Sequence, residues 1–321
     1  MIKNVASVGL PVLETMHIRK NRICPEHLRN AMVQTADATS APKRLSIISG
    51  IYGDELEGQY ICFCLNQILQ EHIDQLNGIV DIYPVINPLG LESIRRGVPS
   101  FDIDINRSFP GNPNGNMLEY SAAKIVEDIK GSDLCIDLHS SNIFLREIPQ
   151  VRIREENKDL LLPYAKWLNC DFIWIHESAT VYNSSFAYAM NHAGVPTLAV
   201  EMGSGMRITR EFGEQLVTGL LNILKQLGMW SGEVQKVRTP IISSDGEVSY
   251  IHAEASGIFL PNIEHWKNVK KGDVIGRIVN SLSGSIEEEI LAPMDGTVFT
   301  LREYPVVYSG SLIARILGGD H

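Results

Sequence analysis

Tyr52 and Glu55 stand three residues apart at a break in the sequence and could begin a metal site. The break lies in LSIISGIYGDELEGQY, residues 45–60, where a short apolar run ends at a glycine and an amphipathic helical pattern begins. Side chains three positions apart can point toward one centre, and a carboxylate is a common ligand of divalent metal ions. Tyrosine is an unusual partner, because a phenol has a pKa of about 10 and binds a metal ion well only after losing its proton.

Polar side chains also follow the other apolar runs of the chain. Imidazole and carboxylate groups at such positions suit metal binding and general base catalysis, and the planar fork of arginine suits a substrate carboxylate. An ionisable residue directly after the apolar run TLAV needs a partner if it is buried. If the runs are neighbouring strands, all of these groups should meet Glu55 at one end of a sheet. The group comprises His139, Glu201, Arg96, Asn106 and Arg107.

Each of these residues also has a purely structural interpretation. Glu55 could be a first-turn residue of a helix, where the helix dipole stabilises a negative charge. His139 could be a hydrogen-bonded core histidine, and Arg107 could simply pair with Asp104 in the loop DINRSFPG. The combination is therefore more informative than any single member.

The elements that must position these residues alternate between strands and helices. Near-continuous apolar strands separated by helical periodicity predict a mostly parallel sheet covered on both faces, with ligands at the carboxyl ends of the strands. The segment VASVGLPVLETMHIRKNRI is consistent with an edge hairpin, and QTADATSAP with a loop. The predicted strands are 44–50, 78–87, 133–139, 171–176 and 196–203, and the predicted helices lie within 61–69, 118–129, 184–192 and 209–227.

The residue pattern of the sequence changes after GMWSGEVQ. Short β-rich runs are separated there by turns such as SSDGE, KKGD and APMDG. We therefore predict two domains, an α/β domain over residues 1–233 and a small all-β domain over residues 234–321. The APMDG turn is similar to that of lipoyl and biotinyl carriers, but Met294 is followed by Asp295 and no carrier lysine is present. We expect this domain to shape the substrate entrance or to form an oligomer contact, without a cofactor.

Composition narrows the class of protein. The chain has 321 residues, 44% hydrophobic and 21% charged, with a formal net charge of -10. Its basic residues are scattered, so we expect neither nucleic acid nor a membrane as partner. Five cysteines without a CxxC pair predict buried free thiols. With no signal-peptide pattern at the N-terminus, we expect a cytoplasmic protein.

Four motifs, in order along the chain, give it a resemblance to a known family. SGIYGDELEG, NPLGLESIRRGVPSFDIDINRSFPG, CIDLHSS and GVPTLAVEMG are similar to those of the succinylglutamate desuccinylase/aspartoacylase family of the zinc carboxypeptidase superfamily. The C-terminal segment resembles the small β-barrel domain of the longer members. The resemblance implies a three-layer α/β/α zinc-carboxypeptidase-like domain with a mixed, mostly parallel sheet, followed by a small barrel-like β domain.

The resemblance also implies roles for the candidate residues. Glu55 and His139 match two zinc ligands of the family, and Tyr52 stands where its first histidine ligand belongs. Glu201 would be the general base. Arg96 would polarise the scissile carbonyl or bind substrate, and Asn106 and Arg107 would grip a substrate carboxylate.

The implied function is a metal-dependent deacylase that cleaves a small N-acyl amino acid with a free carboxylate. A zinc ion with an open position lowers the pKa of its bound water to about 7 and polarises a carbonyl. The alternatives are a carboxylate-binding relative without catalysis and a carboxypeptidase acting on peptides. A homo-oligomer is left open.

Tyr52 leaves three interpretations of the metal site open. The phenolate could ligate, favouring a harder ion than zinc. Asp54, or His176 at a neighbouring strand end, could complete the ligand set instead. In the third interpretation the site holds no metal and the arginines only capture a carboxylate.

Overall fold

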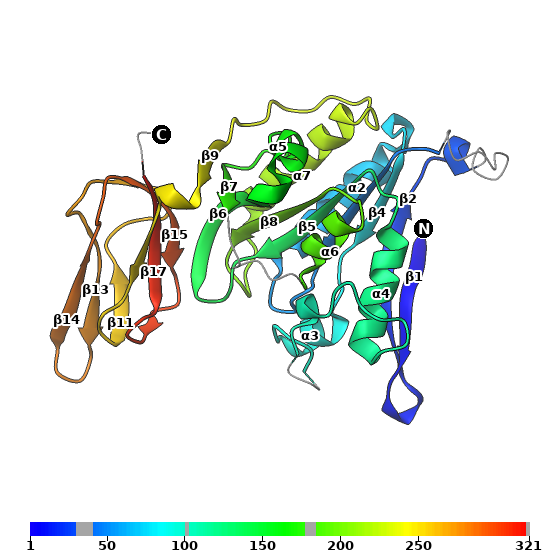
Figure 1. Ribbon diagram of the computed structural model, residues 1–321. Coiled ribbons are helices and arrows are strands. Elements are labelled where there is room, and N and C mark those ends of the chain that lie inside the picture. Colours follow the sequence, from blue (N-terminus) through cyan, green and yellow to red (C-terminus); the bar gives the residue numbers. More distant parts are fainter. Residues whose placement is uncertain (30–40, 100–102, 177–183, 319–321) are drawn as a thin grey trace.

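A thirteen-stranded mixed sheet runs through the whole molecule (Figure 1). The computed structural model describes residues 1–29, 41–99, 103–176 and 184–318. The order across the α/β part is β1-β2-β4-β3-β5-β8-β6, and β7 pairs with β6 and β9. The strands are β1 (Ile2–Gly9), β2 (Thr15–Ile23), β3 (Arg44–Ser49), β4 (Ile79–Tyr83), β5 (Leu134–Ser140), β6 (Leu145–Arg154), β7 (Phe172–His176), β8 (Thr197–Gly203) and β9 (Ile241–Ser244).

Helices cover both faces of this sheet, as the apolar strands require. Along β3, Leu45 and Ile47 pack into one core cluster with α2 (Glu57–Glu71) and α7 (Arg210–Gln226). Ile48 belongs to a second cluster with α4 (Met117–Ile129) and α6 (Phe186–His192). Because successive side chains of a strand point to opposite faces, a strand buried on both faces is mostly apolar. Two short helices, α3 (Pro88–Ser93) and α5 (Lys158–Ala165), complete this part.

The C-terminal part is all β, as predicted, and it continues the large sheet. β10 (Val248–His252), β15 (Gly296–Arg302) and β17 (Leu312–Gly318) extend that sheet, with β12 (Asn268–Val269) beside β15. β11 (Gly257–Pro261), β13 (Val274–Asn280), β14 (Ser285–Leu291) and β16 (Val306–Val307) form a second sheet. β15 pairs with β6, and β9 pairs with β7. The domain division at residue 234 stays a prediction.

The expected fold class is confirmed, and its largest departure from the predicted elements is an additional strand. The expected N-terminal edge hairpin is present as β1 and β2, whereas most of QTADATSAP lies outside the described residues. β6, which the sequence pattern did not predict, is antiparallel to β8 and parallel to β7. β7 therefore runs against the central strands, and its carboxyl end lies at the opposite edge of the sheet. No helix within the described ranges is both long and apolar enough to cross a membrane.

Candidate active site

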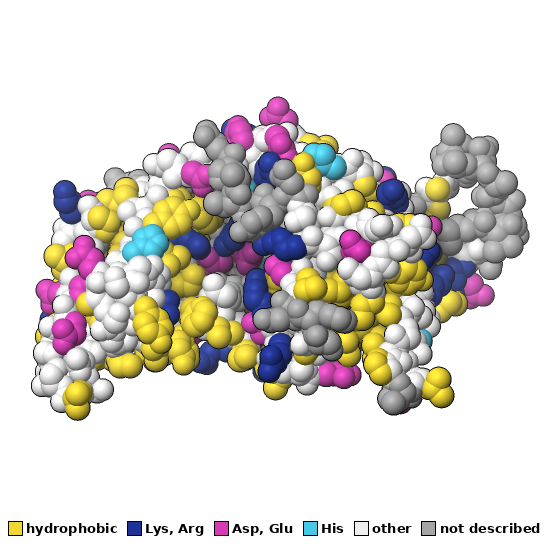
Figure 2. Space-filling model, turned by 60° about the horizontal axis from the view of Figure 1, so that its bottom comes forward, with side chains coloured by type: hydrophobic (Ala, Val, Ile, Leu, Met, Phe, Trp, Pro, Cys, Tyr) yellow, Lys and Arg dark blue, Asp and Glu magenta, His cyan; other side chains and the backbone are white. Residues whose placement is uncertain are grey.

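A pocket opens over one face of the sheet near the carboxyl ends of β5 and β8. Its cavity volume is about 210 Å³. Figure 2 looks onto this side and shows acidic side chains inside a hollow surrounded by basic ones. Every predicted site residue except Glu55 lines the pocket, and Glu55 contacts two residues that do. The lining comprises Tyr52, Arg96, Asn106, Arg107, Asp137, His139, Arg152, Arg154, Asn157, Leu161, His176, Ser185, Ala187, Tyr188, Asn191, Thr197, Ala199 and Glu201.

A tight turn between β3 and α2 positions Glu55. The turn packs closely on α3, since a Cβ at Gly53 would lie 2.0 Å from the carbonyl carbon of Gly90. The amide of Gly53 also donates to the carbonyl oxygen of Arg96. The turn and the long loop after β4 are thereby joined, which brings Glu55 and Arg96 together although they are distant in sequence.

His139 lies at the end of β5 between two carboxylates. Its Nδ1 is 3.0 Å from Oε2 of Glu55, and its Nε2 is 3.0 Å from Oδ2 of Asp137. The amide of Ser140 donates to the same Oε2 of Glu55 at 3.0 Å. Burial disfavours a charged imidazole, but the carboxylates of Asp137 and Glu55 outweigh it and raise the pKa of His139 well above its ordinary value. Both ring nitrogens therefore have a carboxylate as partner.

Tyr52 is buried and packs beside His139, with ring centroids 5.6 Å apart. Its hydroxyl donates to Oδ2 of Asp104 at 3.1 Å. Burial, reinforced by the charge of Asp104, raises the pKa of Tyr52 to about 12. The phenol therefore keeps its proton at neutral pH.

The loop after β4 supplies Arg96, Asn106 and Arg107. Arg96 donates from Nη1 to Oε1 of Glu55 at 2.8 Å. Asn106 is buried, and its Oδ1 accepts a hydrogen bond from the amide of Phe186 at the start of α6. Arg107 is partly exposed, with its Nε 3.6 Å from Oδ2 of Asp104. The expected Arg107–Asp104 pair is thus present, and both Asn106 and Arg107 still reach the pocket.

Glu201 lies beside His139, because the two residues are Cα partners on the parallel strands β8 and β5. Burial raises the pKa of Glu201 to about 7, although Arg152 and His139 act in the opposite direction. Nη1 of Arg152 is 3.5 Å from Oε1 of Glu201, and its Nη2 donates to Glu147. A carboxylate with this pKa is suited to exchanging protons near pH 7.

The residues present do not fit the three-ligand zinc site that the resemblance implies. Glu55 and His139 offer two donor atoms close together, but Tyr52 directs its hydroxyl to Asp104. Within the described residues, no group of three His, Cys, Asp or Glu side chains converges as a metal site would require. Zinc, and Tyr52 as its ligand, stay predictions from the resemblance.

The two residues considered as substitute metal ligands, Asp54 and His176, lie in different places. Asp54 lies 3.8 Å from Nη1 of Arg96. The alternative placing His176 near the metal is corrected: His176 lines the same pocket, but at its other end, where it is the Cα partner of Arg154 at the far end of β6. Glu201 is level with Gln150, four residues from Arg154, which is roughly 13 Å along the strand. The reversal of β6 and β7 is the reason.

Sequence reasoning missed two residues of the site, Asp137 and Arg152, and it named Asp104 only as a partner of Arg107. Asp137 stands two residues before His139 on β5, and this spacing places both side chains on one face of the strand. Arg152 belongs to the unpredicted β6, where Val151 and Ile153 alternate with Arg152 and Arg154. That alternation was the available signal for a strand with one apolar and one charged face.

Comparison with known proteins establishes the family. The fold and pocket define a zinc-carboxypeptidase-like α/β domain joined to a β domain. The model of the succinylglutamate desuccinylase/aspartoacylase catalytic domain matches residues 41–227. The chain belongs to this family.

Similar proteins of stated activity include a deacetylase. The chain is 30% identical over 287 residues to N-alpha-acetyl-L-2,4-diaminobutyric acid deacetylase of Halomonas elongata, covering 84% of this chain and 80% of the relative. A succinylglutamate desuccinylase of Silicibacter sp. TM1040 superposes with a TM-score of 0.82 at 19% identity, covering 99% of this chain and 95% of that one. The product-bound ectoine utilization protein EutE (DoeB) of Ruegeria pomeroyi gives 0.77 at 20% identity, covering 97% and 92%.

Proposed function

We propose that the protein is a hydrolase that removes the acyl group from a small N-acyl amino acid. The observation that carries this proposal is the position of Glu201, a carboxyl group with a pKa of about 7 beside His139 in a pocket lined by four arginines. The family membership and the deacetylase relative support the reaction class.

Each residue has a role that its contacts permit. Glu201 would take a proton from the attacking water and deliver it to the leaving amine. Arg107, with the amide group of Asn106, would bind the substrate carboxylate. Arg96, whose side chain is 45% exposed, would face the acyl oxygen. The excess of arginine in the pocket favours an anionic substrate, because opposite charge concentrates it there.

The test is amine release from a panel of N-acetyl and N-succinyl L-amino acids, including the acetylated diaminobutyrate of the relative. Each substrate is offered to the native protein and to Glu201→Gln, with and without added zinc, manganese or iron. We expect release by the native protein only. Binding without release would favour the carboxylate-binding alternative, whereas release from N-blocked dipeptides alone would favour a carboxypeptidase. The cytoplasmic location stays a prediction.

A further inference from the structure

The guanidinium group of Arg96 lies over the aromatic ring of Tyr52. The guanidinium carbon lies 3.6 Å from the ring centroid, close enough for a cation–π contact. The same guanidinium donates to Glu55 at 2.8 Å and lies 3.8 Å from Asp54. Tyr52 and the two carboxylates thus hold a permanent positive charge next to His139.

A metal ion would need free donor atoms on Glu55 and His139, but these atoms already have partners. Oε1 of Glu55 accepts from Arg96, and its Oε2 faces Nδ1 of His139 and the amide of Ser140. The second nitrogen of His139 faces Asp137. Each side-chain donor atom on Glu55 and His139 therefore already has a protein partner, and a metal ion would have to displace at least one of them.

The hydroxyl of Tyr52 points away from this group. It donates to Asp104, whose other oxygen accepts from the amide of Asn106. The ring is therefore fixed at both ends, by Asp104 at the hydroxyl and by Arg96 on its face. An aromatic ring fixed in this way orients the planar guanidinium, which a histidine committed to a metal ion would not do.

We propose that Tyr52 converts the site from a metal site to an arginine site, in which the guanidinium of Arg96 is the fixed cation beside the acyl oxygen of the substrate. A guanidinium is always charged and offers planar N–H donors, so it can stabilise negative charge on that oxygen without a metal ion. The placement of the substrate rests on the proposed function. The exclusion of the metal rests on the contacts alone.

The decisive experiment measures zinc in the protein itself. The native chain, Tyr52→Phe and Tyr52→His are produced in zinc-supplemented medium, analysed for metal content and titrated with zinc by calorimetry. We expect no stoichiometric zinc in the native protein or in Tyr52→Phe, which keeps the ring. We expect about one zinc per chain in Tyr52→His, which restores a three-ligand set with Glu55 and His139.

Two results would overturn the proposal. Stoichiometric zinc in the native protein that is lost in Tyr52→Phe would make the phenolate a ligand. Stoichiometric zinc in both would mean that other residues complete the site. A thermal unfolding scan of each variant identifies any that fails to fold, and the native and Tyr52→Phe proteins decide the question even if Tyr52→His is unstable.

Once a substrate is known, Arg96 can be tested directly. We expect a chelator to leave the native rate unchanged and Arg96→Lys to lower kcat by about 10²-fold or more, because lysine keeps the charge but not the planar, stacked group. A rate abolished by the chelator and restored by zinc would contradict the proposal. If no substrate is hydrolysed at all, the proposed function fails while the zinc measurement still decides the nature of the site.

Discussion

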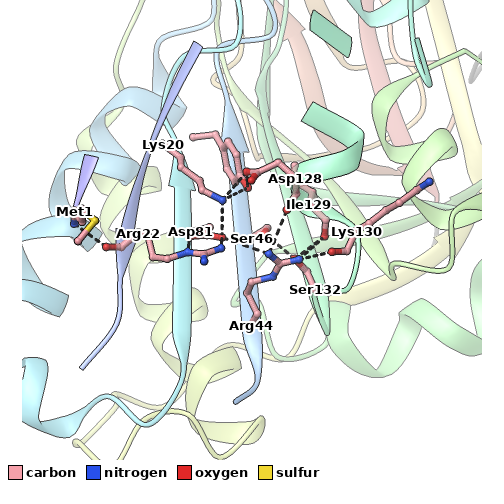
Figure 3. Close-up of polar contacts among 11 residues, drawn as sticks. Met1, Lys20, Arg22, Arg44, Ser46, Asp81, Asp128, Ile129, Lys130 and Ser132 are labelled. Atoms are coloured by element: carbon pink, nitrogen blue, oxygen red, sulfur yellow. Dashed lines mark hydrogen bonds and ion pairs between the residues drawn. The ribbon is translucent and has the colours of Figure 1, made fainter. Parts of the chain in front are cut away.

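Two clusters of buried charge lie toward opposite ends of β3 and differ in how completely they are paired. Toward its amino end, Asp81 is fully buried and accepts two hydrogen bonds from Arg22, at 2.7 and 2.6 Å, and one from Lys20 at 3.1 Å (Figure 3). Lys20 also contacts Asp128, which accepts from the hydroxyl of Tyr83. Both oxygens of Asp81 are therefore occupied.

Toward the carboxyl end, the cluster of Glu55, His139, Asp137, Arg96 and the adjacent Glu201 is paired less completely. Oδ1 of Asp137 is buried without a hydrogen-bond partner among the described residues, and the same is true of Oδ1 of Asp54. A buried oxygen without a hydrogen bond is costly, so native proteins retain one mainly where it serves a ligand or a reaction. Burial of charge therefore does not by itself identify a site. Incomplete pairing next to a cavity is the better indicator.

The substitution Glu201→Gln should separate the two clusters most clearly, because it should lower activity without lowering stability. We expect kcat to fall by about 10²- to 10⁴-fold, the usual contribution of a general acid–base group. The unfolding midpoint at pH 8 should not fall, because burial already favours the uncharged carboxyl group. Steady-state kinetics and thermal unfolding check both, with Glu127→Gln on the exposed face of α4 as control. A rate within twofold of native would remove Glu201 from the reaction.

Asp81→Asn should do the opposite, lowering the free energy of unfolding without changing activity. Removing one partner from a buried ion cluster costs about 3–5 kcal/mol of unfolding free energy, since Arg22 and Lys20 lose a carboxylate. Activity per folded molecule should not change. Urea denaturation measures the loss, and Lys124→Gln, which breaks an exposed pair with Glu127, should cost less than about 1 kcal/mol. A similarly small loss for Asp81→Asn would mean that the closed cluster is not structural.

The two clusters should also respond to pH in different ranges. Glu201 acts as a base only when ionised, so with a pKa of about 7 kcat/KM should rise about tenfold between pH 6 and pH 8. Burial would raise the pKa of Asp81, but Arg22 and Lys20 outweigh it and lower the pKa below the usual 3.8. Its contribution to stability is therefore complete above 3.8 and lost only as the pH falls through the lower folded value. On one buffer series, the rate should change near pH 7, whereas the difference in stability between the native protein and Asp81→Asn should shrink only below pH 3.8; a coincidence of the two ranges would contradict this separation.

Arg152→Gln should give the smallest effect on the reaction. Arg152 lowers the pKa of Glu201, so its loss should move the acidic limb of the kcat/KM profile to higher pH. Arg146→Gln, on the same strand but outside the pocket, should leave the limb in place. A downward shift in Arg152→Gln would show that the two side chains are not coupled as their 3.5 Å distance suggests.

The central strands and the residues at their carboxyl ends could be predicted because both depend on local pattern. β3 and β5 are buried strands rich in apolar residues, and Glu55, His139 and Glu201 follow or end such runs. β6 could not be identified in the same way, since Pro149, Gln150 and Arg152 depart from a buried apolar strand. Arg152 is tolerated there only because Glu147, five residues earlier on the same strand, and Glu201, on β8, neutralise it. The direction of β7, and hence the place of His176, depended on that missing strand.

The pairing of β15 with β6 has a consequence for how this gene could have been assembled. Arg315 and Thr300 from the C-terminal part contact Glu147, and Glu147 holds Arg152 beside Glu201. If the C-terminal segment were exchanged for another module, β6 would lose its pairing with β15 over Leu145–Glu147. Glu147 would also lose its ion pair with Arg315. The two parts are therefore expected to have diverged together, as one inherited unit, and shuffling between relatives should succeed only when both are exchanged.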